Sequence, residues 1–188
     1  MSNPSKDAAA PDQGRMLRDV LGLFPTGVAV ITAVSPEGER LGATVSSFNS
    51  VSLTPPLILF SMARTAKSFP AWEAVEHFAV NILNESQSRI STQFARSLSD
   101  KWEGLDPVAG RVTGIPLIRD ALAWLECRTW ARYEGGDHLI IVGEVLGFER
   151  LTSGAARPLV FSASRYARLA TDAEIATPPH EGHLVHGW

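Results

Sequence analysis

The sequence has a single cysteine, Cys127, among its 188 residues, so it can form neither an internal disulfide nor a multi-cysteine metal site. Its net charge of −3 at pH 7 gives no basic excess of the kind that binds nucleic acid or an anionic membrane. The longest apolar runs, such as residues 56–60, are too short to span a bilayer, and residues 1–14 lack the apolar segment of a secretory signal. These absences predict a soluble, cytoplasmic protein that binds neither nucleic acid nor membranes.

Several motifs of common enzyme classes are also missing. No Gly-x-Gly-x-x-Gly lies between a strand and a helix, and there is neither a Walker A motif nor a Gly-x-Ser-x-Gly elbow. His180, His183 and His186 lie close together near the C-terminus, but the surrounding residues suggest no rigid second shell, so we interpret any metal binding there as adventitious. Cys127 lies within a strand pattern and is interpreted as structural.

The length and composition predict one globular domain with a substantial core. Residues 1–14 and 171–188 hold little that can be buried, so we expect disordered tails on either side of a domain over 15–170. The pattern of β-branched and alternating residues predicts strands at 28–34, 39–45, 57–62, 77–83, 121–133, 138–148 and 159–161. Short helices are expected over 16–24, 68–75 and after Asn84, which forms a capping box with Gln87.

Seven or eight strands joined by tight turns, without long helices between them, favour a mainly β fold. Because closure removes exposed sheet edges, the strand inventory favours a closed antiparallel barrel. Within it, residues 57–62 are expected to form a buried central strand.

One stretch, Thr44–Pro56, is unusually polar for an extended segment, since it carries seven hydroxyl or amide side chains. Alternating donors and acceptors along extended backbone suit the polar edge of a flat ring. The alternative is a serine-rich strand end whose hydroxyls satisfy nearby backbone groups.

Two further segments carry candidate chemistry. Residues 63–70 place two cations and two hydroxyls before a short helix whose N-cap is Ser68, which suits a phosphate; the alternative is a solvated surface helix. The turn 135–137 is followed by His138, which begins an otherwise apolar strand. An unpartnered imidazole there is costly, although a histidine satisfied by local hydrogen bonds would explain it equally.

Taken together, these segments resemble the flavin reductase family. The resemblance rests on Phe24-Pro25-Thr26-Gly27-Val28, Thr44-Val45-Ser46-Ser47-Phe48, Val51-Ser52-Leu53-x-Pro55-Pro56-Leu57, Phe78-x-Val80-Asn81-x-Leu83, Gln93-Phe94-Ala95, Ala121–Cys127, Gly136-Asp137-His138 and Pro158–Phe161. The motifs occur in the family's order and span residues 16–168. The resemblance implies a split β-barrel that binds FMN or FAD, usually as a homodimer.

The resemblance also implies which residues contact the cofactors. The flavin ring would lie along Thr44, Val45, Ser46, Ser47, Phe48 and Asn49, with Val51 and Ser52 alongside. The flavin phosphate would be held by Ala66, Lys67 and Ser68, and contacted from a helix by Phe94, Ala95 and Arg96. His138, in the catalytic role, and Tyr166 would face the nicotinamide. Ala66 stands where family members often have a hydroxyl.

The activity implied by the resemblance is hydride transfer from NADH or NADPH to FMN or FAD, after which the reduced flavin serves a separate flavin-dependent monooxygenase. Two alternatives from other classes stay open. One is a non-catalytic FMN-binding protein that senses redox state, and the other is an oxidase that retains its flavin. The sequence distinguishes neither FMN from FAD nor NADH from NADPH.

Overall fold

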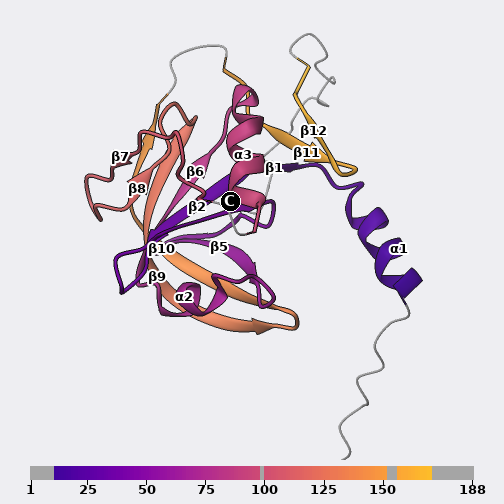
Figure 1. The fold of residues 1–188 in the computed structure, drawn as a ribbon, viewed down its shortest axis with the longest axis horizontal. Coiled ribbons are helices and arrows are strands. Elements are labelled where there is room, and N and C mark those ends of the chain that lie inside the picture. Colours follow the sequence, from indigo (N-terminus) through magenta and orange to yellow (C-terminus); the bar gives the residue numbers. More distant parts are fainter. Residues whose placement is uncertain (1–10, 98–99, 152–155, 171–188) are drawn as a thin grey trace, which may run out of the picture.

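The computed structural model describes residues 11–97, 100–151 and 156–170. Its main body is a seven-stranded antiparallel sheet with the strand order β3-β2-β6-β9-β10-β5-β4 (Figure 1). The strands of this sheet are β2 (Ala29–Val34), β3 (Arg40–Val45), β4 (Asn49–Leu53), β5 (Pro56–Ala63), β6 (His77–Ile82), β9 (Ala123–Gly135) and β10 (His138–Arg150). The mainly β fold predicted from the sequence is therefore confirmed.

The hairpins of the sheet form where turn residues interrupt β-branched runs. Between β2 and β3, the Ser35 hydroxyl accepts hydrogen bonds from the backbone N–H groups of Glu37 and Glu39, and Gly38 has a φ of +85°. Between β9 and β10, Gly136 has a φ of +74°, which suits a two-residue turn. Both turns were predicted from composition, and both are confirmed.

The sheet curls on itself but its hydrogen-bond ladder stays open at one seam. Among the described residues, β3 and β4 are the two edge strands and do not pair with each other, and residues 46–48 cross between them. The closed ladder favoured by the strand inventory is thus wrong, whereas the split barrel implied by the family resemblance is confirmed. The expectation of a central strand at 57–62 is also wrong, because β5 is second from the edge and its residues alternate between buried and partly buried.

The interior of the curled sheet is filled by aromatic rings. Phe60 makes edge-to-face contacts with Phe78 at 5.1 Å and with Trp72 at 6.0 Å between ring centroids, and all three side chains are fully buried. Trp72 comes from α2 (Phe69–Ala74). The ring therefore anchors the segment that follows β5 to the core. Removing one such ring costs about 3–5 kcal/mol.

A second core cluster lies under α3 (Ser88–Ala95), on the outer side of β2 and β3 (Figure 1). The helix follows a 3₁₀ turn, η1 (Glu85–Gln87), and the predicted capping box is present. The Asn84 side chain accepts a hydrogen bond from the Ser86 N–H at 2.8 Å, and the Gln87 side chain accepts one from the Asn84 N–H at 3.1 Å. Strands β7 (Val108–Ala109) and β8 (Pro116–Leu117) form a short ladder, and β8 lies against β2 and β6.

A small sheet and a projecting helix complete the described chain. Strands β1 (Thr26–Gly27), β11 (Val160–Ser162) and β12 (Arg165–Ala167) pair beside the main body. From β1, α1 (Pro11–Leu21) projects away from the rest of the chain (Figure 1) and begins inside the segment that was expected to be disordered. No helix of the described residues is long and apolar enough to cross a bilayer. Residues 171–188, including His180, His183 and His186, lie outside the described residues.

Candidate functional site

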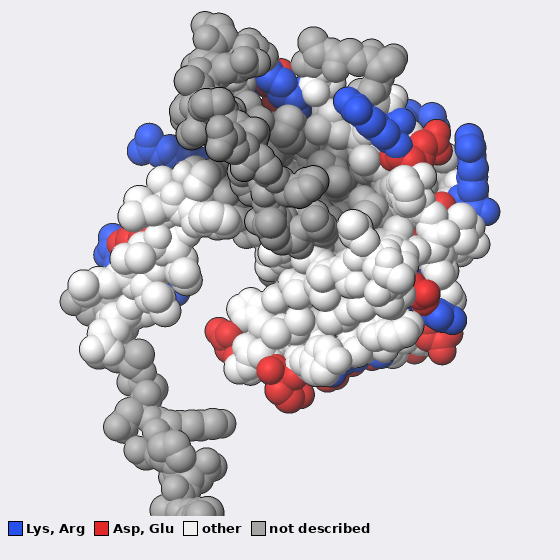
Figure 2. Space-filling view, turned by 180° about the vertical axis from the view of Figure 1, so that it is seen from behind, with Lys and Arg blue, Asp and Glu red and all other residues white. Residues whose placement is uncertain are grey.

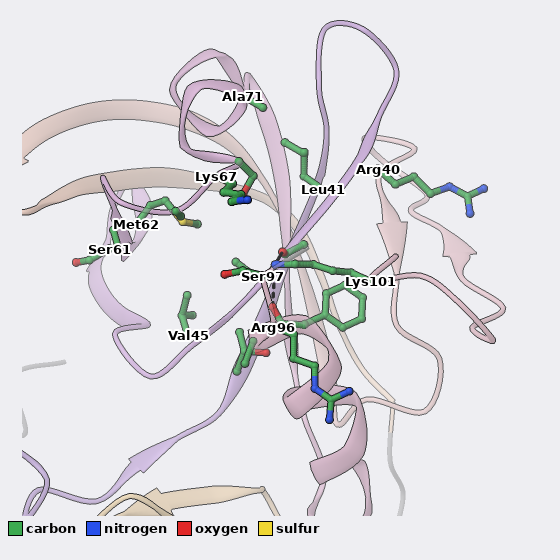
Figure 3. Close-up of a pocket in the computed structure, with 18 of the residues that line it drawn as sticks. Arg40, Leu41, Val45, Ser61, Met62, Lys67, Ala71, Arg96, Ser97 and Lys101 are labelled. Carbon is green, nitrogen blue, oxygen red and sulfur yellow. Dashed lines mark hydrogen bonds between the residues drawn. The ribbon is translucent and has the colours of Figure 1, made fainter. Parts of the chain in front are cut away.

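One cavity of about 800 Å³ lies against the seam side of the barrel (Figure 3). Its walls come from β3, the end of β5, the segment leading into α2, the end of α3 and the residues that follow it. Eleven of the sixteen residues predicted as site residues line this cavity, namely Thr44, Val45, Ser46, Ser47, Ala66, Lys67, Ser68, Phe94, Ala95, Arg96 and His138. Its volume falls in the range of about 300–1,000 Å³ that is typical of ligand sites.

Thr44, Ser46 and Ser47 place three hydroxyls on the wall formed by β3 and the residues after it, and these differ in whether they are already hydrogen-bonded. The Thr44 hydroxyl donates to the Ser91 carbonyl at 2.6 Å, which ties β3 to α3. The Ser47 hydroxyl accepts from the Ser61 N–H at 3.0 Å, and so ties the seam to β5. The Ser46 hydroxyl is exposed and makes no hydrogen bond to any described residue, so of these three hydroxyls it is the one that is free to meet a ligand.

The second half of the polar stretch does not line the cavity. The Asn49 side chain accepts a hydrogen bond from the Ser50 N–H, and the Ser52 hydroxyl accepts one from the Thr54 N–H at 3.2 Å. Phe48 packs against the core and Val51 is 48% exposed, both away from the cavity lining. For these positions, satisfaction of local backbone groups explains the polar side chains.

The segment 66–68 lies opposite, between β5 and α2. Ser68 occupies the predicted N-cap position of α2 and Pro70 lies in its first turn, but the Ser68 hydroxyl makes no capping hydrogen bond. Lys67 is exposed at the rim of the cavity (Figure 3). Arg64, by contrast, pairs with Glu134 at 2.6 Å and lies 5.1 Å from the centroid of the Phe69 ring. Lys67 and Ser68 are therefore the groups of this segment that are available to an anion.

The end of α3 approaches β3 closely. A Cβ added at Gly42 would overlap the ring of Phe94, so only glycine leaves room for this fully buried ring. Behind it, the Lys101 ammonium donates to the carbonyl oxygens of Gly42 at 2.8 Å and Phe94 at 3.0 Å. Sequence reasoning missed Lys101, because nothing in its loop marked it; Gly42 was missed because a glycine in a strand does not reveal what ring lies over it.

His138 stands at the start of β10, paired in the ladder with Ala63 of β5. Its Nδ1 lies 2.7 Å from Oδ1 of Asp137. This hydrogen bond, together with the charge of an imidazolium, lowers the pKa of the Asp137 carboxyl. A carboxylate that binds Nδ1 orients the ring and leaves Nε2 for another molecule.

Tyr166 lies outside the cavity lining of its own chain. Its hydroxyl is 2.8 Å from the Ser91 hydroxyl, and its ring contacts Phe161 edge to face at 5.6 Å. Tyr166, which lies in β12, thus joins the small sheet to the middle of α3. Cys127 is fully buried, and burial raises the pKa of its thiol to about 12.

The comparisons with known proteins place this arrangement in a family. Residues 21–170 match the model of the flavin reductase like domain. The chain belongs to this family. It is 42% identical over 163 residues to the FMN reductase (NADH) SmoA of Agrobacterium fabrum, covering 85% of this chain and 88% of that protein.

Two further members show the extent of the similarity. The stachydrine N-demethylase reductase subunit of Rhizobium meliloti is 45% identical over 135 residues, which are 72% of this chain but only 58% of that protein. The chain thus spans little more than half of that relative's length. Among solved structures, an NADH:FAD oxidoreductase of Streptomyces globisporus in complex with NAD and FAD fragments superposes with a TM-score of 0.80 at 40% identity, covering 88% of this chain and 98% of that one.

Proposed function

We propose that this chain is a flavin reductase that transfers hydride from NADH to FMN or FAD. The observation that carries the proposal is the single cavity that gathers the hydroxyl wall at 44–47, the cation and hydroxyl at 67–68, the end of α3 and His138. Relatives over most of its length are named for NADH and for FMN or FAD, and family membership is shown by the match over 21–170.

The residues present fit a flavin. The walls offer the free Ser46 hydroxyl, the Ser68 hydroxyl, which makes no capping hydrogen bond, and the Lys67 ammonium. The remaining lining includes apolar side chains such as Val45 and Met62. A ring with one polar edge and a phosphate tail needs this combination of apolar wall and few polar contacts. A bound flavin would supply the hydride-accepting ring, and reduced nicotinamide the hydride.

The chain's own contribution is to bind and orient. The Ser46 hydroxyl would hold the polar edge of the flavin, and Lys67 with Ser68 its phosphate. His138, whose Nδ1 is bonded to Asp137, lines the cavity together with Ser61 and Ala63, and its Nε2 would position the nicotinamide. Alignment of the two reacting rings, rather than proton transfer by a side chain, is the source of rate acceleration in this proposal.

The experiment is a nicotinamide-oxidation assay with purified protein in the four combinations of NADH or NADPH with FMN or FAD. We expect oxidation with NADH and at least one flavin. If absorbance of the reduced nicotinamide never falls faster than in the enzyme-free control, the reductase function is wrong. A chain that binds flavin but oxidises no nicotinamide would instead be a flavin-binding protein.

His138→Ala tests the positioning role. We expect a higher KM for NADH with flavin affinity retained, because the histidine meets the nicotinamide and not the flavin tail. His77→Ala is the matched control, since His77 also begins a strand and does not line the cavity. Equal kinetic constants for the two variants would contradict the role.

We also propose that reduced flavin passes to a separate monooxygenase component in the cytoplasm. The support is a relative named as the reductase subunit of a flavin-dependent monooxygenase, which is 36% identical over 166 residues, together with the family resemblance. Adding a flavin-dependent monooxygenase with its substrate should couple NADH oxidation to product formation. A flavin that stays bound through many turnovers would contradict this transfer.

A homodimer is proposed from the exposed face of α1 and the turn that follows it. Met16, Leu17, Val20, Leu21, Leu23 and Phe24 are 59–76% exposed. Figure 2 shows α1 as a projection that is mostly uncharged from this side. Large contiguous apolar surfaces mark interfaces, and a second copy would cover this one. We expect a dimer by light scattering that Val20→Glu dissociates, whereas Arg15→Glu on the charged face does not.

A further inference from the structure

Lys101 lies at the wall of the cavity, on the loop that follows α3 (Figure 3). Its ammonium donates to two backbone carbonyls, Gly42 O at 2.8 Å on β3 and Phe94 O at 3.0 Å at the end of α3. Two fixed acceptors on different elements hold the ammonium in one place. This distinguishes it from Lys67, whose side chain is exposed.

The positive charge of Lys101 has no partner of opposite sign among the described residues. Both of its acceptors are neutral carbonyls, and the neighbouring Asp100 carboxylate instead accepts a hydrogen bond from the Trp102 N–H at 2.9 Å. Burial accordingly lowers the pKa of Lys101. A half-buried cation without a counter-ion is costly, and an anionic ligand would remove that cost.

The cavity as a whole is cationic although the chain is acidic. Four positively charged residues line it (Arg40, Lys67, Arg96 and Lys101) against two acidic ones (Glu39 and Asp100), whereas the whole chain has a net charge of −3. A lysine that merely capped the last carbonyls of α3 would explain the bond to Phe94 O. It would not explain why unpaired charge concentrates on the walls of one cavity.

We propose that Lys101 is a phosphate-binding residue of this cavity, holding the phosphate of FMN or the diphosphate of FAD together with Lys67 and Ser68. The inference rests on the proposed flavin-binding function. Lys101 contributes one N–H from a position fixed by Gly42 O and Phe94 O, and Lys67 closes over the phosphate from the opposite wall.

The test measures dissociation constants for riboflavin, FMN and FAD by fluorescence quenching, on the full chain and on Lys101→Met and Lys101→Gln. A charge-assisted hydrogen bond to phosphate is worth about tenfold or more in affinity, so both variants should weaken FMN and FAD by that factor. Riboflavin has no phosphate, and its affinity should stay within about twofold. Lys101→Arg, which keeps the charge, should restore part of the loss.

Arg89→Met is the matched control, because Arg89 is an exposed cation on α3 outside the cavity lining; it should change no flavin affinity. If Lys101→Met weakens riboflavin as much as FMN, the residue only supports the fold and the inference is wrong. If only the KM for NADH changes, the phosphate belongs to the nicotinamide and the flavin assignment is wrong. A wild-type chain that binds no flavin would overturn the proposed function itself, and the inference with it.

Discussion

The contact between Gly42 and Phe94 provides the sharpest prediction about how the fold holds the cavity. A Cβ at position 42 would lie well inside van der Waals distance of Phe94 Cδ1 and Cε1. The ring cannot simply turn aside, because it is fully buried and contacts Trp102 edge to face at 5.1 Å. Gly42→Ala therefore forces the end of α3 away from β3.

The magnitude follows from the cost of overpacking. Inserting a methyl into a filled core costs about 1–3 kcal/mol, and a chain of this size loses about 2–4 °C in Tm for each kcal/mol. The same displacement lengthens the bridge from Lys101 to Gly42 O and Phe94 O, so affinity for FMN should fall along with stability. Urea titration and thermal unfolding measure the first effect, and flavin quenching measures the second.

Gly27→Ala is the matched control, since nothing lies within 4 Å of a Cβ there and Gly27 has no left-handed φ. We expect it to be neutral or slightly stabilising, because alanine restricts the unfolded chain. Phe94→Leu should recover part of the stability lost in Gly42→Ala, since the smaller side chain leaves room for the methyl. A Gly42→Ala protein as stable as the Gly27→Ala control would refute the steric argument.

Three further predictions concern buried polar groups. Burial, and secondarily the Glu126 charge, raise the pKa of Cys127 to about 12, so the native thiol should not react with maleimide at pH 8 although denaturant should expose it. Since the folded thiol keeps its proton while the unfolded one loses it, stability should fall by about 1.4 kcal/mol per pH unit above pH ~9, and Cys127→Ala should abolish that slope in urea titrations. Asn81 is fully buried, and its side chain bonds Val30 O, the Thr32 hydroxyl and the Ile118 N–H. Asn81→Leu leaves these three groups without this partner, so the free energy of unfolding should fall by at least about 2 kcal/mol. An unchanged urea midpoint would contradict this.

Local patterns predicted most of the elements because each depends on nearby residues. The β2–β3 turn, the capping box at Asn84 and the hairpin at Gly136 involve residues within four positions of one another, and all were predicted. The order of strands in the sheet depends instead on contacts between distant segments. That is why the strand inventory placed β5 at the centre and favoured a closed ladder, whereas the split of the barrel was implied only by the family resemblance.

The residues of the candidate site also divide into those that local sequence reveals and those that depend on contacts between distant segments. Sequence reasoning found segments whose composition is unusual where they stand, such as the hydroxyl wall and Lys67-Ser68. It could not find Lys101 or Gly42, because their importance comes from contacts between distant segments: Lys101 bonds Gly42 O, 59 residues away, and Gly42 lies against the ring of Phe94. It also could not tell which hydroxyls of the polar stretch are already paired, since the partners Ser61 and Ser91 lie on other elements.

The open seam explains why one short segment combines structural and binding roles. An edge strand leaves backbone groups without ladder partners, and these must be satisfied by side chains, water or ligand. At the seam, Ser47 satisfies the backbone of Ser61 and Thr44 that of Ser91, so two hydroxyls join the barrel to its neighbours. Ser46 lies between them with its own hydroxyl free. In the proposed function, the flavin edge would approach the backbone at the same discontinuity that leaves the barrel split, and pairing β3 with β4 would close that approach.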